Sequence, residues 1–108
     1  MFRKESNNSI LPELDADGYL VDSHKWTKEV AEILAKKEMK QDLTEDHWRV
    51  IDYLRQYFLD NESAPPVRML SRDTGLSLRD LKDLFPEGLA NCACRYAGLP
   101  RRVLNRYP

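Results

Sequence analysis

The sequence has 108 residues and a formal net charge of −1 at neutral pH, which is the size of one domain and gives no overall attraction to nucleic acid or membrane surfaces. Its composition, 42% hydrophobic and 32% charged, is typical of a folded protein, and we expect residues 1–108 to form a single domain. No apolar run reaches the roughly 18 residues of a membrane span and no signal segment is seen, so we expect a cytoplasmic protein with its two cysteines reduced.

The N-terminal part predicts a disordered stretch followed by a tight turn. Residues 1–9 are polar and are expected to be disordered. Two short apolar stretches then flank Asp15-Ala16-Asp17-Gly18, where glycine after aspartate supplies the positive φ that a tight turn needs. This pattern predicts a small β-hairpin over residues 10–22. The turn does not match a calcium loop, because its glycine comes two positions early and Trp26 stands where the bidentate glutamate is needed.

Two amphipathic helices are predicted next, and each begins at a hydroxyl side chain that can cap its first turn. Ser23 caps the first helix and Thr44 the second, where Glu45 and Asp46 place negative charge at the positive end of the helix dipole. Apolar residues then recur every three or four positions, which is the spacing of one helix face. The two stripes are Trp26, Val30, Ile33 and Leu34, and Trp48, Ile51, Leu54 and Phe58.

A third and a fourth helix form a pair joined at Gly75. Pro66 fits the first turn of the third helix, and Gly75 fits the position just after its end. Ser77 caps the fourth helix together with Asp80 in a capping box, and Pro86 stops it. The residues of the fourth helix that we expect to pack inward are Leu78, Leu81 and Leu84.

This pair of helices has the outline of a helix-turn-helix. The exposed face of its second helix carries Arg79 and Lys82 but also Asp80 and Asp83. A helix that reads a DNA groove is normally more uniformly basic, so plain helix packing is favoured and nucleic acid is the less favoured partner.

A fifth helix, predicted from Gly88 to Ala97, leads into a C-terminal arm over residues 99–108. After Glu87 the sequence has no acidic residue, so this end of the chain is basic although the body is slightly acidic. The arginines that fall there are Arg95, Arg101, Arg102 and Arg106. Such a segment is either a solvated tail or an arm that docks on an acidic or phosphate-bearing partner. The predicted fold is therefore mostly α, with a small hairpin and a flexible arm.

Both cysteines lie in the fifth helix, two residues apart. At 100° per residue, Cys92 borders the apolar face and Cys94 lies farther round, beside Asn91. This interpretation makes Cys92 a core thiol and Cys94 the accessible one, although both could equally well pack in the core, as free cysteines often do. Their side chains diverge, which disfavours a disulfide between them.

No metal site or catalytic constellation is predicted. Cys92, Cys94, His24 and His47 could ligate zinc, but the histidines lie far apart, His47 is expected on the surface of a first helical turn, and Cys-x-Cys is not the usual spacing. No catalytic triad signature and no glycine-rich phosphate loop is seen. We therefore expect no metal, no cofactor and no turnover by this chain alone.

Several segments occur along nearly the whole chain in an order typical of one known family. They are "DADGYL", the tryptophan at Trp26, "VAEILAKKE", "LTEDHWRVIDYLRQYF", "PPVRML", "LFPEG" and "CRYAGLPRR". On these segments the chain resembles the DsrC/TusE family, which includes the gamma subunit associated with dissimilatory sulfite reductase and the TusE sulfur-relay protein of tRNA 2-thiouridine synthesis. The most specific segments are "LTEDHW" and "CRYAGLP".

The resemblance implies a helical body, a hairpin and a C-terminal arm that enters partner proteins and carries sulfur on cysteines. Cys94 matches the first arm cysteine and would be the sulfur-carrying thiol. Arg95, Arg101, Arg102 and Arg106 would dock the arm on sulfite reductase or sulfurtransferase partners, and the nearby positive charge would lower the pKa of the thiol.

The chain departs from the family at the second arm cysteine. That residue would stand about eleven positions after Cys94, where this sequence has Asn105, and no cysteine follows. A sulfur bridge between two arm cysteines therefore cannot form within this chain. Three hypotheses remain: a sulfur carrier or accessory subunit that acts through Cys94, a regulatory module whose helix-turn-helix contacts DNA or a protein, and a degenerate paralogue that only binds partners.

Overall fold

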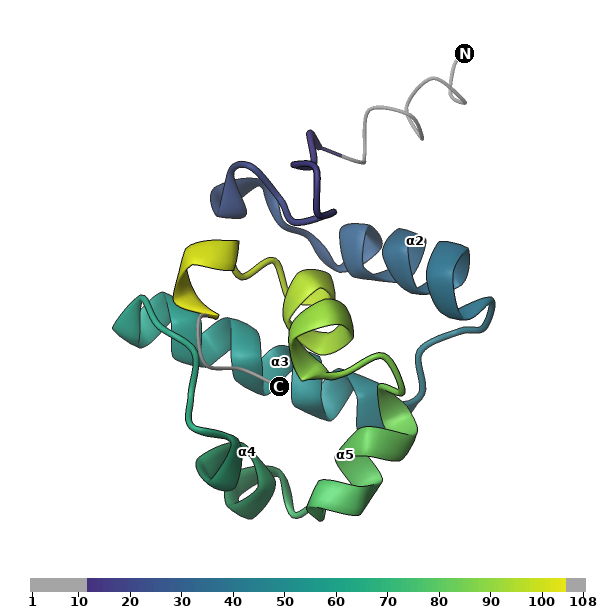
Figure 1. Ribbon diagram of the computed structural model, residues 1–108, viewed down its shortest axis with the longest axis vertical. Coiled ribbons are helices and arrows are strands. Elements are labelled where there is room, and N and C mark those ends of the chain that lie inside the picture. Colours follow the sequence, from purple (N-terminus) through teal and green to yellow (C-terminus); the bar gives the residue numbers. More distant parts are fainter. Residues whose placement is uncertain (1–11, 105–108) are drawn as a thin grey trace.

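The longest helix, α3 (Glu45–Asn61), runs through the middle of the fold, and the other elements pack around it (Figure 1). The computed structural model describes residues 12–104. Helix α2 (Lys28–Met39) lies on one side of α3, and the pair α4 (Val67–Thr74) and α5 (Leu78–Leu84) lies on the other. A short π-helix, η2 (Leu89–Cys94), contacts α3 directly. The prediction of a mostly helical protein with about five helices is confirmed, and no helix among residues 12–104 is long and apolar enough to cross a membrane.

The predicted β-hairpin is a hairpin in shape only. One carboxylate oxygen of Asp15 accepts hydrogen bonds from the backbone N–H groups of Asp17 and Tyr19, both at 2.9 Å, and Gly18 takes a φ of +89°. The arms of the turn meet in a single antiparallel bridge between Leu14 and Leu20, and the described part of the chain contains no strand. So short a ribbon has little stability of its own, and packing against the helical body holds it in place.

The first predicted helix begins later than the sequence indicated. Ser23 belongs to a single 3₁₀ turn, η1 (Ser23–Lys25), which Asp22 caps. Helix α2 starts at Lys28, with Thr27 as its N-cap. Between the two, Trp26 is extended and its indole Nε1 donates to the Tyr96 carbonyl oxygen at 2.6 Å. Trp26 therefore lies outside the helix that the apolar stripe predicted, because the Thr27 cap starts α2 after it.

The caps predicted for the other helices are confirmed. Thr44 accepts from a backbone N–H at the start of α3, and Ser77 forms a reciprocal capping box with Asp80 at the start of α5. Gly75 ends α4 with a φ of +77°. Because each of these residues acts within four positions of its partner, the sequence alone shows the arrangement.

His47 lies in the core, so its prediction as a surface residue was wrong. The backbone N–H of Thr44 donates to its Nδ1 at 3.0 Å, and its Nε2 lies 3.0 Å from the carbonyl oxygen of Leu84. A backbone N–H can only donate, so Nδ1 carries no proton and Nε2 donates to Leu84. The imidazole therefore ties the start of α3 to the end of α5, and its edge packs on the ring of Phe85.

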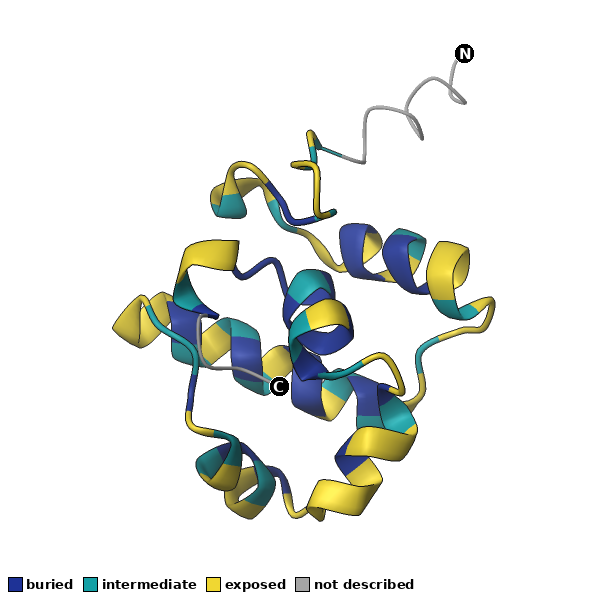
Figure 2. Cartoon of the chain, in the orientation of Figure 1, coloured by how far each residue is buried: buried dark blue, intermediate teal, exposed yellow. Residues whose placement is uncertain are grey.

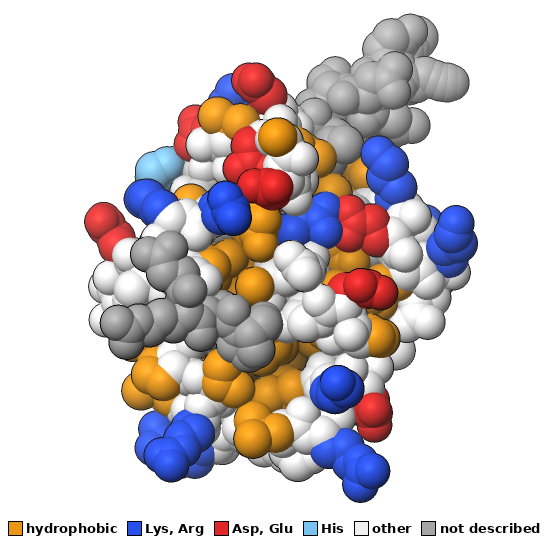
Figure 3. Space-filling model, in the orientation of Figure 1, with side chains coloured by type: hydrophobic (Ala, Val, Ile, Leu, Met, Phe, Trp, Pro, Cys, Tyr) orange, Lys and Arg blue, Asp and Glu red, His pale blue; other side chains and the backbone are white. Residues whose placement is uncertain are grey.

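Most of the apolar residues predicted for the core are buried, but Leu78 is not. Figure 2 shows buried residues on the faces of the helices that turn inward. Leu81 is buried and Leu84 partly so, whereas Leu78 is 58% exposed. It stands at the first position of a helix of only seven residues. Figure 3 shows hydrophobic side chains at the surface between α4 and α5.

The segment after Gly98 belongs to the helical body as far as residue 104. Leu99 is fully buried, Leu104 is 7% exposed, and a 3₁₀ turn, η3 (Arg101–Val103), lies between them. The prediction of a flexible arm over residues 99–108 is therefore wrong for residues 99–104, because Val103 and Leu104 pack against the core. Residues 105–108, like the predicted disordered residues 1–9, lie outside the described part of the chain.

Candidate functional site

The helix that carries both thiols is not a regular α-helix. It begins after Gly88, whose φ is +101°, and residues 89–94 form a π-helix before a last α-helical turn. Gly98 ends that turn: its N–H donates to the carbonyl of Arg95 at 3.1 Å, and the N–H of Leu99 donates to the carbonyl of Cys94 at 3.0 Å. This pair of hydrogen bonds is a Schellman motif, which a glycine at positive φ permits.

Both thiols are buried, and the deeper one is Cys94. Cys94 has no exposed surface and Cys92 is 2% exposed, so the prediction that Cys94 is the accessible thiol was wrong. Burial raises the pKa of both thiols, because a thiolate in an apolar interior loses its hydration. Because the thiolate is the nucleophile, both cysteines are poor nucleophiles in this fold.

The N-terminal turn packs against η2. The hydroxyl of Tyr19 donates to the carbonyl of Ala90 at 2.9 Å, and Trp26 bonds to Tyr96 as described above. On its other side η2 packs on α3. A π-helix also turns less per residue than the 100° assumed for an α-helix, so the wheel misplaces Cys94, whereas Cys92 lies in the core as predicted.

Arg95 is held inside the fold by an ion pair with Glu38 of α2. Its Nη1 donates to one carboxylate oxygen of Glu38 at 2.7 Å and to the carbonyl of Asn91 at 2.8 Å, while Nη2 contacts the other carboxylate oxygen. Its Nε donates to the carbonyl of Gly18 at 3.1 Å, and the side chain is 12% exposed. Arg95 thus joins α2, η2 and the N-terminal turn. The expected lowering of the Cys94 pKa by neighbouring arginine is contradicted, since burial raises that pKa.

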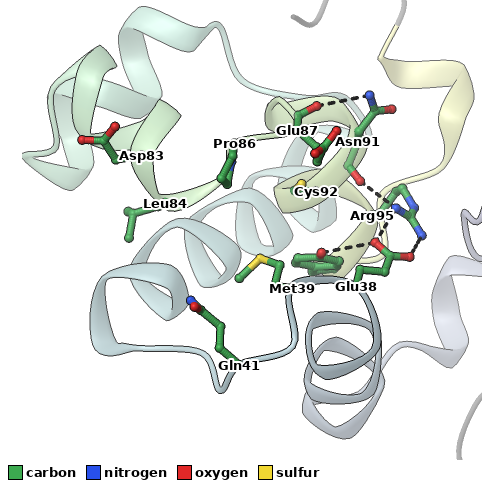
Figure 4. Close-up of a pocket in the computed structure, with 11 residues that line it drawn as sticks. Glu38, Met39, Gln41, Asp83, Leu84, Pro86, Glu87, Asn91, Cys92 and Arg95 are labelled. Atoms are coloured by element: carbon green, nitrogen blue, oxygen red, sulfur yellow. Dashed lines mark hydrogen bonds and ion pairs between the residues drawn. The ribbon is translucent and has the colours of Figure 1, made fainter.

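A pocket of about 380 Å³ opens beside this ion pair, between α2, the end of α5 and η2 (Figure 4). Cys92, Tyr96 and Arg95 line it from η2 and the turn after it, and Glu38 lines it from α2. The Tyr96 hydroxyl donates to a carboxylate oxygen of Glu38 at 3.2 Å. Cys92, not Cys94, is therefore the thiol that faces a hollow in the protein surface.

Sequence reasoning missed Glu38 and Tyr96 as part of this pocket. Glu38 lies 57 residues from Arg95 in sequence, and no local pattern pairs the two. The one available signal was the isolated arginine within an otherwise apolar turn, because an arginine that is not solvated needs an acidic partner.

Two other predicted partner-binding arginines, Arg101 and Arg102, lie at the surface near the N-terminal turn. Arg101 forms an ion pair with Asp17 at 3.2 Å, and both side chains are more than half exposed. Arg102 is exposed next to it, and both arginines line a shallow hollow with Tyr19. Arg106 lies outside the described residues. Their role in binding a partner stays a prediction.

Metal ligands do not gather anywhere among residues 12–104. No three side chains of histidine, cysteine, aspartate or glutamate in that range lie close enough to hold a metal ion. His24 is exposed at η1, while His47 uses both ring nitrogens in hydrogen bonds within the core.

Comparison with known proteins decides the family. Residues 7–103 match the profile of the DsrC family, described as DsrC like protein. This chain belongs to the DsrC/TusE family. It is 40% identical to the gamma subunit of dissimilatory-type sulfite reductase from Nitratidesulfovibrio vulgaris Hildenborough, over 82% of this chain and 85% of the relative. It is 39% identical to the sulfurtransferase TusE homolog of Haemophilus influenzae, over 87% of this chain and 92% of the relative.

Solved structures of the DsrC/TusE family share this fold. The oxidized gamma subunit DsrC of the dissimilatory sulfite reductase from Archaeoglobus fulgidus superposes with a TM-score of 0.76 at 45% identity, over 82% of this chain and 87% of that chain. The structure of dissimilatory sulfite reductase I (DsrI) superposes with a TM-score of 0.77 at 39% identity, over 82% of this chain and 85% of that chain. The resemblance read from the sequence is thereby confirmed.

Proposed function

We propose that this DsrC/TusE protein is an accessory subunit that binds a sulfite reductase or a sulfurtransferase of a sulfur relay, and that it does not carry sulfur on a thiol of its resting fold. The burial of both cysteines supports this proposal. With a pKa above the ordinary value of about 8.5, less than about a tenth of either thiol is ionised at pH 7.5. The residual thiolate of Cys94 is also screened from a donor, because this side chain has no exposed surface.

The position of Asn105 supports the same proposal. Where the family has its second arm cysteine, this chain has an amide side chain that cannot form a persulfide. The predicted sulfur-carrying role of Cys94 would require the N-terminal turn to leave η2, which breaks the hydrogen bonds from Tyr19 and Arg95. We therefore favour partner binding over sulfur transfer for the closed structure.

Loading with sulfur tests the proposal directly. The folded protein is incubated with inorganic polysulfide, and intact-mass spectrometry counts the sulfur atoms gained. We expect no gain on the native wild-type chain and a gain on both cysteines after unfolding in urea. The variant Asn105→Cys restores a cysteine at the family position, and we expect it to gain sulfur in the native state.

The outcome that contradicts the proposal is a native wild-type protein that gains sulfur at Cys94 as fast as Asn105→Cys gains it at the new thiol. That result would favour the carrier hypothesis. A capture experiment with immobilised wild-type protein completes the test, because an accessory subunit must retain a sulfite reductase or a sulfurtransferase whether or not its own cysteines are replaced by alanine.

A further inference from the structure

An apolar groove lies between α4, α5 and the start of η2, on the part of the surface that Figure 3 shows between the two short helices. It encloses about 340 Å³, within the range of ligand and peptide pockets. Its apolar walls are Val67, Leu78, Leu81, Phe85 and Leu89. We call it the α4–α5 groove.

Leu78 leaves an apolar side chain exposed to water at the edge of the groove. Its side chain is 58% exposed although it stands beside the buried Leu81 and Phe85. A leucine left in water at the edge of an apolar hollow forgoes the gain from burial, and exposed apolar patches with a polar border mark interaction sites. The capping box of Ser77 and Asp80 holds the first turn of α5, so Leu78 is presented by an ordered backbone.

The basic side chains beside the groove have no ion-pair partner among the described residues. Arg68 of α4 and Arg79 and Lys82 of α5 are exposed and form no ion pair within residues 12–104, and Lys82 itself lines the groove. Basic side chains flank the hydrophobic surface on both helices in Figure 3.

Most acidic side chains of the same helices either form hydrogen bonds or ion pairs within the protein or lie outside the groove. Asp73 accepts a hydrogen bond from the Tyr53 hydroxyl at 2.6 Å and pairs with Arg72. Asp80 accepts from the backbone N–H of Ser77 at 3.0 Å. Asp83 lines the separate pocket beside Glu38 rather than the groove. The surface offered to a partner is thus apolar in the centre and basic at the rim.

We propose that the α4–α5 groove binds an acidic amphipathic segment of a protein partner, with large apolar side chains against Leu78 and Val67 and carboxylates toward Arg68, Arg79 and Lys82. The inference rests on the proposed accessory function and names the chemistry of the partner that it binds. A peptide fits the surface better than DNA, because the apolar walls of the groove form no favourable contact with a phosphate backbone. Apolar anchors with complementary charges around them are the usual design of such a contact.

The test uses the full chain labelled with nitrogen-15 and a synthetic helical peptide. The peptide has about 14 residues, with leucines at i, i+3, i+4 and i+7 and glutamates elsewhere. A matched peptide replaces every glutamate with lysine. We expect the acidic peptide to shift the amide signals of α4, α5 and the start of η2, and the basic peptide to bind at least about tenfold more weakly.

Two variants with the same substitution locate the site. Leu78→Glu should weaken the acidic peptide by about tenfold or more, because it removes the central apolar contact and adds repulsion. Leu59→Glu, at a leucine of α3 that is 53% exposed and lies outside the groove, should leave the affinity unchanged. Equal loss in both variants, or no shift with about 1 mM acidic peptide, overturns the proposal.

Other occupants would each give a distinct result that also overturns it. Groove signals that move with protein concentration alone identify a second copy of this chain. Groove signals that move when residues 105–108 are deleted identify the chain's own end. Shifts with a 20-base-pair DNA duplex at low micromolar concentration, lost in Arg79→Ala, identify nucleic acid. Sulfur loading of the native protein would contradict the proposed function but leaves this peptide test unaffected.

Discussion

Cys94 keeps its proton because its sulfur lies in the core, where no water and no positive charge stabilise a thiolate. Arg95 is next to it in sequence, but the guanidinium of Arg95 donates hydrogen bonds to Glu38 of α2 and to the N-terminal turn. Adjacency in the chain therefore says little about electrostatic effect, since neighbouring side chains on a helix diverge. Protonation of Cys94 has a consequence for stability.

We predict that the free energy of unfolding falls as the pH rises above about 8.5. An unfolded cysteine loses its proton near that pH while folded Cys94 keeps it, so the unfolded state binds fewer protons and gains relative stability. The loss is about 1.4 kcal/mol for each pH unit in this window. Urea unfolding at several pH values up to about 9.5 measures it, below the range in which tyrosine titrates.

The variant Cys94→Ala is the control for this pH dependence. It removes one titrating thiol, so its stability should fall less steeply with pH than that of the wild type, although the cavity makes it less stable at every pH. An unchanged slope would show that Cys94 ionises normally in the folded protein.

His47 provides a second prediction at the scale of one residue. Its imidazole joins the start of α3 to the last carbonyl of α5, so His47→Ala removes two buried hydrogen bonds and leaves the Leu84 carbonyl unsatisfied. We expect a loss of about 2–4 kcal/mol of stability by chemical unfolding. The exposed His24 is the matched control, and His24→Ala should change stability by less than about 0.5 kcal/mol. Similar losses in both variants would contradict the core position of His47.

At the scale of elements, η2 and the turn after it contact α3, α2 and the N-terminal turn. Helix α3 packs behind it, the Tyr19 hydroxyl and the Trp26 indole bond to its carbonyls or to those of the next turn, and Glu38 of α2 pairs with Arg95. The Schellman motif at Gly98 turns the chain back toward the body. Trp26 lies so close to that turn that a β-carbon on Gly98 would stand 2.6 Å from its ring.

A pair of glycine variants separates backbone strain from this close packing. Gly98 and Gly75 both have a φ of +77°, but a β-carbon on Gly75 would meet no atom within 4 Å. Gly75→Ala should therefore cost only the left-handed backbone conformation, about 1–2 kcal/mol. Gly98→Ala must also displace the Trp26 indole, so we expect a clearly larger loss.

The measurement for this pair is urea unfolding followed by tryptophan fluorescence, with the emission of the folded variants recorded first. Only Gly98→Ala should shift that emission, because only there does the indole move. Equal losses from the two glycines would mean that Trp26 does not pack on the turn after η2.

At the scale of the whole molecule, the C-terminal residues 99–104 close the fold instead of leaving it. Leu104 belongs to the same hydrophobic core as Val30 and Leu54. The last described residue is therefore packed in the core of the helical body. The Arg101–Asp17 pair adds little stability, because both side chains are exposed to solvent. Burial of Leu104 therefore contributes more than this ion pair to holding residues 99–104 against the body.

We predict that Leu104→Ala destabilises the protein by about 2–3 kcal/mol and lowers Tm by on the order of 10 °C. The control is Val21→Ala, at an apolar residue that is 58% exposed and should tolerate truncation with little change. Thermal unfolding by circular dichroism measures both. A melting temperature unaffected by Leu104→Ala would restore the hypothesis of a free arm from residue 99 onward.

Local signals in the sequence were reliable guides to local structure. Thr44, Ser77 and Gly75 cap or end the helices as predicted, since each satisfies backbone groups within one turn of itself. In the stripe of α3, Ile51, Leu54 and Phe58 are buried as their spacing indicated, and Trp48 is partly buried. The segments shared with the DsrC/TusE family likewise indicate the fold.

What the sequence by itself determined is therefore the helical class, most helix boundaries, the family and the absence of a cysteine at Asn105. The tertiary structure alone decided where the thiols, Arg95, His47 and Leu104 lie, because contacts between residues far apart in sequence set their burial. A helical wheel shows which residues share a face, but the N-terminal turn that covers η2 comes from more than seventy positions away. That the α4–α5 groove with Leu78 stays open among the described residues is likewise decided by contacts between distant residues.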